Sequence, residues 1–491
     1  MSKTLSCKLI SSMNMNEKRY FKIYCKRHTI GSQNKYEFMF TLLNKNSNLS
    51  DDSIKESLLS KKYKSKNLSS DFNYLNKLIL RSLNEFNLNK TTDLKVKSNM
   101  ISIEIMFLKG LYDECLKLID KTKRIIKLNE NGALMLDLLN WEKKCLGYSK
   151  GFYSAMALNN TIDLYFKSYS SNRTITDLYY QSYYLKKNVD KISSDLLLKE
   201  IEVIKNNPII VSGINDLMSI QSQVFFYLIF SNFYFIEKDL HNELLFLNKT
   251  ILVFNNNVQY KKENPLDFIS IYIRIIDIHK NYESSIFYEK INTLRSLDST
   301  LSFKKDVIEE RIFFHTSKAE LEHFIFNNNI AVAHETMIKI KETILKNKYK
   351  IEPYYYIDLY YIFACIHFLN KNLSAALKFV NTIFNEYKLK QKPSVYIKTE
   401  LMNIIIHFEL ENYDVTLYNI DGFRKKYLPI FKINAIEKKI INIISKISKN
   451  PNSKIKLKEF EKLSTELEAS GILTSSVSNC FYINYVKSNA S

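Results

Sequence analysis

Residues Gly110-Leu111-Tyr112-Asp113-Glu114-Cys115 stand between two apolar runs, 101–108 and 116–126, and their order indicates a corner between two helices. A turn residue comes first, a large apolar residue follows two positions later, and a small residue closes the group. The turn residue lets the chain reverse, the large residue fills the end of the corner, and the small residue permits close contact between helices. We therefore expect a helical hairpin here.

The same order recurs along most of the chain. Further copies, of which the first two are weaker, start at Gly151, Lys238, Lys280, Asn328, Lys371 and Glu411. The successive intervals are 41, 87, 42, 48, 43 and 40 residues, so that 87 is about two periods and one unit near residue 190 is degenerate. A period near 42 accommodates two helices and their turns. These copies predict an irregular α-solenoid of helical hairpins over residues 91–470.

The composition favours an all-α protein. The 491 residues include 8 Gly and 6 Pro, about 3% together, where roughly 12% is usual. Sheets need Gly and Pro in tight turns and bulges, and phosphate-binding loops need clustered Gly. The scarcity argues against all-β folds and Gly-rich nucleotide sites, which leaves a mostly helical chain.

Residues 1–90 are predicted to form a small basic module of four helices. They carry 17 Lys or Arg against 7 Asp or Glu, which is half of the net charge of +20. Such a surplus is typical of proteins that bind phosphate-rich or carboxylate-rich partners. The alternative is the codon bias of an AT-rich genome, because Lys, Asn, Ile, Tyr and Phe are all abundant. Codon bias is the favoured explanation for the whole chain, and both explanations stay open for the module.

One helix of this module is a candidate for nucleic-acid contact. If the helix over 70–86 buries its apolar residues, its outer face carries residue types that suit base edges and phosphates. Four lysines precede it, where phosphate contacts could set the register. The candidate contacts are Lys61, Lys62, Lys64, Lys66, Asn73, Lys77 and Arg81, with Asn76 on the same outer face. Any solvated helix can show such a face, so nucleic-acid binding is the alternative function.

A tyrosine-rich segment is the candidate peptide groove. Tyr offers a large contact area and a polar tip, which suits the recognition of peptide side chains. The residues concerned are Tyr354, Tyr355, Tyr356, Tyr360 and Tyr361. The favoured alternative is that these rings act as spacers between packed helices.

No motif for catalysis, cofactor binding or metal binding is complete. The glycines lack the Gly-Lys-Ser/Thr of a phosphate loop, and no G-x-S-x-G elbow occurs. The sequence from His334 begins like a zinc-protease helix but has Ile338 in place of the second His. Glu320 and His323 form one Glu-x-x-His step, where a di-iron bundle needs two. We expect no cofactor, no metal, no small-molecule substrate and no enzymatic activity.

The cysteines and the apolar runs bear on location. Six scattered cysteines without a C-x-x-C pair are typical of reduced thiols, and no signal-peptide pattern is present, so a cytoplasmic location is expected. Residues 217–236 are uncharged for 20 positions, about the length of a membrane span. Six of them are polar, so a central helix enclosed by its neighbours is favoured and no membrane contact is expected.

The C-terminal part continues the helical pattern. Apolar residues from Ile433 to Ile447 share one face of an amphipathic helix that could close the last hairpin. A further helix is expected over 453–470, between Pro451 and Gly471. Residues 472–491 lack clear periodicity, so 471–491 is expected to be a loose tail.

Two resemblances rest on these residues. The corner with Gly110, Tyr112 and Cys115 resembles that of tetratricopeptide (TPR) repeats, although that family's period is 34 and its Trp, Leu-Gly pair and closing Pro are mostly missing. The stretches 16–22 (NEKRYFK) and 139–144 (LNWEKK) resemble a group of uncharacterised bacterial helical-repeat proteins. The first resemblance implies longer, irregular TPR-like hairpins, and the second implies no activity.

The leading hypothesis is therefore a non-catalytic scaffold. Stacked hairpins form a concave surface that can hold a protein or peptide partner. The alternative is a nucleic-acid-associated regulator, which would bind DNA or RNA with the basic module and sense a partner with the repeats. An enzyme with an unrecognised site comes third.

Overall fold

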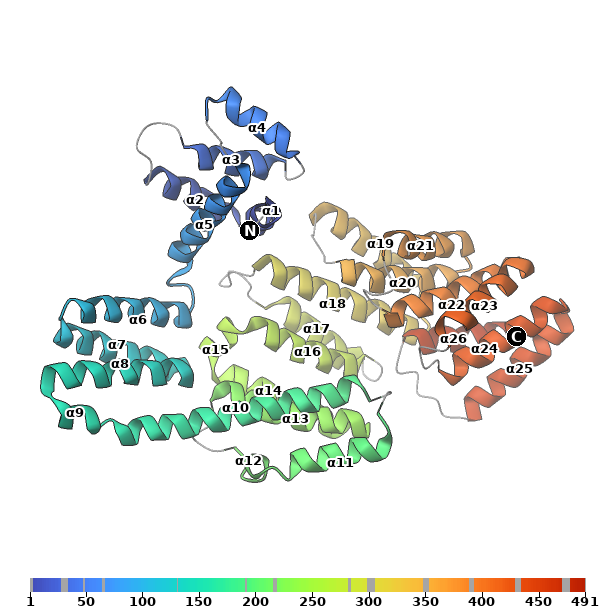
Figure 1. The fold of residues 1–491 in the computed structure, drawn as a ribbon. Coiled ribbons are helices and arrows are strands. Elements are labelled where there is room, and N and C mark those ends of the chain that lie inside the picture. Colours follow the sequence, from blue (N-terminus) through green and yellow to red (C-terminus); the bar gives the residue numbers. More distant parts are fainter. Residues whose placement is uncertain are drawn as a thin grey trace. The chain divides into compact units, whose positions relative to one another are not determined.

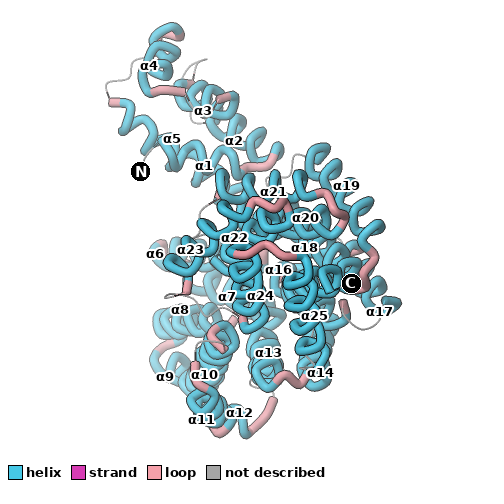
Figure 2. Tube along the Cα trace, turned by 90° about the vertical axis from the view of Figure 1, so that its right-hand side faces the viewer, coloured by secondary structure: helices cyan, strands magenta, loops and turns pink. Residues whose placement is uncertain are grey.

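The protein is helical wherever the structure describes it. The structure is a computed structural model that describes residues 3–27, 34–46, 49–63, 67–129, 131–189, 192–214, 219–280, 284–297, 305–347, 353–387, 393–428, 434–469 and 477–490. These ranges contain helices and no strand, which confirms the prediction of an all-α protein (Figure 1, Figure 2). The chain divides into two compact units, residues 1–181 with 194–226, and residues 182–193 with 227–491.

The N-terminal residues of the first unit form a helical module with its own hydrophobic core. Its helices are α1 (Lys3–Ser12), α2 (Met15–Arg27), α3 (Lys35–Lys45), α4 (Asp51–Ser60) and α5 (Leu68–Asn87). Phe21 and Phe40 stack in this core with ring centroids 4.3 Å apart, and Leu75 and Ile79 are fully buried in it. Helix α1 is an addition to the four predicted helices, and it packs against α3 and α5.

Eight further helices follow the module. They are α6 (Thr92–Leu108), α7 (Tyr112–Asn129), α8 (Gly132–Lys150), α9 (Phe152–Met156), α10 (Asn159–Lys187), α11 (Ser194–Lys205), α12 (Pro208–Val211) and α13 (Ile220–Glu237). Helices α6, α7 and α8 enclose a separate core that includes Cys115 and Leu138. The predicted boundary at residue 90 thus falls inside the first compact unit but between two hydrophobic cores. The last part of α10 and most of α13 belong to the second unit.

The second unit continues as a series of helices in which each packs against the next. They are α14 (Leu240–Asn256), α15 (Val258–Glu263), α16 (Pro265–His279), α17 (Ser284–Arg295), α18 (Lys305–Phe326), α19 (Ile330–Asn347), α20 (Pro353–Leu369), α21 (Leu373–Glu386), α22 (Pro393–Glu409), α23 (Tyr413–Tyr427), α24 (Ala435–Lys449), α25 (Ser453–Ala469) and α26 (Val477–Ala490). Helices α18 and α19, α20 and α21, and α22 and α23 are hairpins whose members lie side by side (Figure 1). The first helices of these three hairpins also contact one another in order, because α18 contacts α20 and α20 contacts α22.

Five of the predicted corners share one backbone geometry. The turn residue has a positive φ of 75°, 60°, 57°, 58° and 59° at Gly110, Lys238, Asn328, Lys371 and Glu411. In each corner its N–H donates to the carbonyl three residues back, and the next N–H donates to the carbonyl five residues back. These two bonds close the end of the first helix. The residue five positions after the turn is buried in every case: Cys115, Glu243, Ala333, Ala376 and Thr416.

The other two predicted corners differ. Gly151 has a φ of 87°, but Tyr153, the residue expected to fill the corner, is 89% exposed and begins no long helix. Lys280 has a helical φ of −56°, and residues 281–283 of that copy lie outside the described residues.

The C-terminal segment also differs from the expected loose tail. Residues 477–490 form α26, and its Phe481, Tyr482, Tyr485 and Val486 side chains are at most 1% exposed. Those four residues share one side of the helix. The segment is therefore ordered by long-range packing rather than by a strong local pattern.

The corner geometry predicts the effect of glycine at Lys371. A left-handed backbone disfavours any residue with a Cβ, so Lys371→Gly should raise the free energy of unfolding by about 1 kcal/mol. Exposed Lys378, within α21, is the matched control, and Lys378→Gly should lower it by about 1 kcal/mol. Urea unfolding of both variants checks this, and an equal loss in both would contradict the corner geometry.

Candidate functional site

In the second unit, three neighbouring helices present one continuous row of side chains. On α20, Asp358, Tyr361, Cys365 and Phe368 recur at helical spacing and are all buried. Helices α18 and α22 flank α20 on either side. We call the following ten residues the shared face: Lys318 and Glu322 of α18; Asp358, Tyr361, Cys365 and Phe368 of α20; and Lys398, Met402, Ile405 and Glu409 of α22.

One end of the shared face is a network of ion pairs that joins three helices. Glu322 accepts a hydrogen bond from Nζ of Lys280, the residue that follows α16, at 2.7 Å, and its other oxygen lies 3.8 Å from Lys318 Nζ. Lys318 Nζ in turn donates to Asp358 Oδ2 at 3.3 Å. The Glu322 and Asp358 side chains are only 10% and 7% exposed. These contacts hold α18 against α20 and against the end of α16.

The charges in this network keep one another ionised. Burial raises the pKa of the Glu322 carboxyl, but the Lys280 and Lys318 ammonium groups outweigh burial and hold that pKa below its usual value. Burial lowers the pKa of both lysines, but the carboxylates beside them together outweigh burial, so both lysine pKa values lie above the usual one. These carboxylates are Glu322 with Asp277 for Lys280, and Glu322 with Asp358 for Lys318. Lys398 also favours the charged form of Glu322. This end of the shared face is therefore charged and internally balanced.

A second polar cluster surrounds the corner at Lys238. Glu243 stands where the other corners have a small residue, and it accepts a hydrogen bond from Nη2 of Arg274 on α16 at 2.7 Å. Ser231 Oγ and Asn232 Oδ1 of α13 accept from the same guanidinium at 2.7 and 3.3 Å. Burial, with Arg274 close by, lowers the pKa of Lys186 to about 7. A buried charged residue at this position explains why the sequence copy is weak.

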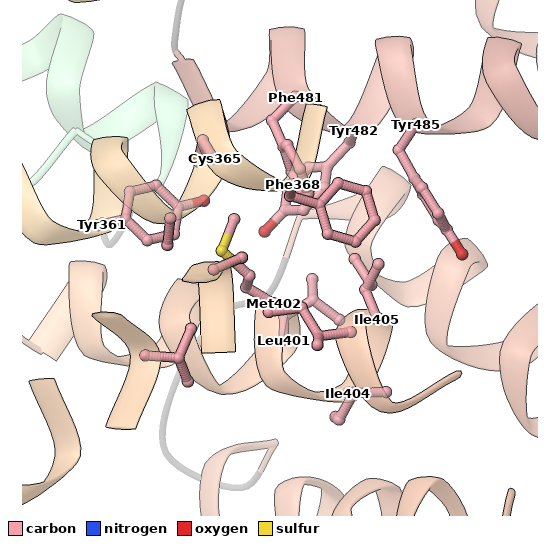
Figure 3. Close-up of a cluster of buried hydrophobic side chains, with 14 of the residues drawn as sticks. Tyr361, Cys365, Phe368, Leu401, Met402, Ile404, Ile405, Phe481, Tyr482 and Tyr485 are labelled. Carbon is pink, nitrogen blue, oxygen red and sulfur yellow. The ribbon is translucent and has the colours of Figure 1, made fainter. Parts of the chain in front are cut away.

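The other end of the shared face lies under α26. Figure 3 shows Phe481 and Tyr482 directed from α26 toward Cys365 and Phe368 of α20 and Met402 of α22. The Phe368 ring centroid lies 5.2 Å from that of Phe481 and 5.7 Å from that of Tyr485. The cluster thus joins side chains from three helices that are far apart in the sequence.

Hydrogen bonds fix the far end of α26. The Tyr485 hydroxyl donates to Glu409 Oε1 at 2.8 Å, and Lys456 of α25 lies 3.2 Å from the other carboxylate oxygen. Burial, with Glu409 close by, raises the pKa of Tyr485 well above its usual value, so the phenol stays protonated and can donate. Glu409 is therefore the polar anchor of an otherwise apolar contact.

The predicted tyrosine groove is not brought together as one surface. Tyr355 packs on Phe314 of α18 with ring centroids 4.3 Å apart, whereas Tyr360 packs on Phe379 of α21 at 5.7 Å. Tyr361 faces α26 and is buried, and Tyr356 lies 5.7 Å from Tyr360. The side chain of Tyr354 lies outside the described residues. The described rings act as spacers to three different neighbours.

The candidate nucleic-acid contacts are only partly on the surface. Lys61, Lys62, Lys77 and Arg81 are exposed, Asn73 is half-buried, and Lys64 and Lys66 lie outside the described residues. Asn76, expected on the outer face, is instead fully buried, and its Oδ1 accepts a hydrogen bond from Ser6 Oγ of α1 at 2.8 Å. The unpredicted helix α1 covers that part of α5. One pair of exposed basic residues, Lys77 and Arg81, therefore lies one turn apart on α5.

The described part of the chain brings together neither a metal site nor a membrane span at the positions considered from the sequence. Among the described residues, no three His, Cys, Asp or Glu side chains converge as metal ligands. His323 Nδ1 lies 2.6 Å from the carbonyl oxygen of Lys280, and Glu320 pairs with Arg295 at 2.6 Å, so the two do not act together. Of the described helices, none has the length and apolar content of a membrane span, α13 included.

Comparison of the chain with protein families, curated proteins and solved structures finds no match. A functional assignment therefore depends on the shared face, the polar cluster around Glu243 and the basic module. Of these three, the shared face is the one that a helix from the C-terminal part of the chain, α26, contacts.

The ion network predicts a large loss of stability in Glu322→Gln. This change removes the buried carboxylate that Lys280 and Lys318 share and leaves them only Asp277 and Asp358. Removing one partner of a buried pair destabilises by about 3–5 kcal/mol. The matched control is Glu342→Gln, because Glu342 pairs with Lys346 at the surface with 60% and 78% of these side chains exposed. The control should change the free energy of unfolding by about 0.5 kcal/mol or less.

Chemical denaturation at pH 7 measures both changes. The pKa of Glu322 is lowered in the folded state, so its contribution is present above its unfolded value of about 4.5 and is lost as the pH falls through the lower folded value. The two variants should therefore differ most above pH 5. Equal effects of the two substitutions at pH 7 would show that the network does not hold these helices.

Proposed function

We propose that this chain is a non-catalytic scaffold, a TPR-like α-solenoid of helical hairpins that binds a helix of a protein partner on the shared face. The five corners of one geometry and the neighbour-to-neighbour packing of α16, α18, α20 and α22 support the solenoid. The first helices of successive hairpins, here α18, α20 and α22, form a row, and such a row is a surface on which stacked hairpins commonly bind partners.

The contacts of α26 carry this proposal. In a stack of hairpins each unit contacts only its neighbours. Helix α26 follows α25 in sequence, yet it also contacts α18 and α20, and its Tyr485 bonds to Glu409 of α22. An element that touches three successive first helices lies across them. The shared face is thus a surface on which a helix can be held.

The chemistry of the buried groups favours binding over catalysis. The carboxylates of Glu322 and Asp358 are engaged by lysines. Burial raises the pKa of the Cys365 thiol far above its usual value, so this thiol is a poor nucleophile. The five described cysteines are free thiols, which supports a reducing, cytoplasmic location.

Nucleic-acid binding by the basic module stays a prediction. Exposed Lys61, Lys62, Lys77 and Arg81 are the contacts it would use. Because Asn76 is buried, it is not accessible to a base edge, and α5 offers one side chain fewer for base recognition than expected. Phosphate contact alone would make such binding insensitive to sequence.

Site-specific photocrosslinking tests the scaffold proposal. A benzoylphenylalanine at position 398, on the shared face, should form a crosslink to one partner protein in the native host. The same amino acid at position 378, exposed on α21, is the matched control and should not. Both variants should keep the thermal transition of the parent protein.

The identity and stoichiometry of the crosslinked protein decide the outcome. One partner recovered from position 398 and not from position 378 supports the scaffold. Equal crosslinking from both positions, or none from position 398, contradicts binding on the shared face.

A further inference from the structure

The contact between α26 and the shared face depends on a short pattern. Phe481 and Tyr482 are adjacent, and Tyr485 and Val486 follow one turn later, so all four side chains project from one side of the helix. Exposed Lys487 lies on the other side. Buried residues along one side of a helix are typical of a helix that is held in a groove.

The position of α26 is that of a ligand rather than of an end cap. A helix that capped the stack would cover the outer side of its last hairpin, α24 with α25. Helix α26 contacts α25 but continues onto α18 and α20, and its Phe481 and Tyr485 rings pack on Phe368 of α20 (Figure 3). A partner could contact Cys365 and Phe368 only if α26 moved away.

We propose that α26 is an internal ligand of the shared face, and that the protein partner displaces it with a helix of the same pattern. That pattern is two adjacent aromatic residues followed one turn later by a tyrosine and an apolar residue. The tyrosine hydroxyl of the partner takes over the hydrogen bond to Glu409 that Tyr485 makes here. This proposal rests on the proposed function and names the class of partner.

Helix α26 and a partner helix compete for the shared face, and α26 has the advantage of belonging to the same chain. A ligand in the same chain acts at a high effective concentration, in the millimolar range for short linkers. A partner helix must therefore overcome the bound α26, and its apparent affinity is reduced by the fraction of protein whose face is open. The fourteen residues of α26 must be ordered when it docks, and this entropy cost keeps the docking reversible.

Hydrogen exchange on the intact protein is the first test. Amides of α26 should exchange at least about tenfold faster than amides of α20, because α26 opens while the hairpins stay folded. Exchange of both helices at one common rate would show that α26 leaves only when the whole unit unfolds. That result would overturn the proposal.

Peptide exchange is the second test. A protease site is introduced within 470–476 to cut the chain between α25 and α26, and a fluorescent peptide of residues 477–491 is then added. The peptide should bind saturably and replace the cut segment. A control peptide with Tyr482→Ala and Tyr485→Ala should bind at least about 100-fold more weakly, because it lacks two of the buried rings and the bond to Glu409.

Each result of the peptide-exchange experiment decides whether α26 is an internal ligand. If the peptide fails to bind while the cut protein keeps its thermal transition, or if loss of the segment unfolds the unit, α26 is part of the core and the proposal falls. Partner crosslinking from position 398 would then still support the scaffold. Peptide exchange without any crosslinked partner would leave α26 as an internal ligand and remove the proposed function.

Discussion

The burial of one side of α26 on the shared face is the contact on which the functional account depends. Phe481, Tyr482, Tyr485 and Val486 are buried against helices that precede them by many residues, and burial of each such side chain contributes about 1.5–3 kcal/mol. This contact requires that α18, α20 and α22 keep a fixed order and spacing. The corners and the ion network fix this order and spacing.

The ion network is a positioning device more than a source of stability. The loss of water around Glu322, Lys280 and Lys318 offsets most of their attraction, so a paired buried network contributes little net free energy. A shifted helix would leave one of these charges buried and unpaired, which is strongly unfavourable. The network therefore disfavours alternative registers of α16, α18 and α20, beside the apolar end that α26 covers.

The local features of this chain were predictable from its sequence, and the long-range ones were not. The scarcity of Gly and Pro predicts the helices, and the corner pattern finds Asn328, Lys371 and Glu411 because a turn residue and a small residue five positions later are local requirements. Asp358 is the only Asp, Glu, Lys or Arg in α20, which signals a buried partner, but nothing in the sequence identifies Lys318, 40 residues earlier. Likewise, residues 477–490 show no clear periodicity, so neither α26 nor the face it covers follows from the sequence. Asn76 is predicted to be exposed because nothing in the sequence shows that α1 covers it.

The most direct measurement of the central claim is a nuclear Overhauser effect between the rings of Phe368 and Tyr485. A deuterated protein in which only Phe and Tyr carry protons isolates this contact, and Phe368→Leu assigns it. The account predicts a cross peak for this pair, whose ring centroids lie 5.7 Å apart, as well as for Phe460 and Tyr485 at 5.5 Å. A cross peak to Phe460 of α25 without one to Phe368 would contradict it, because α26 would then pack on its neighbour in sequence and leave the shared face uncovered.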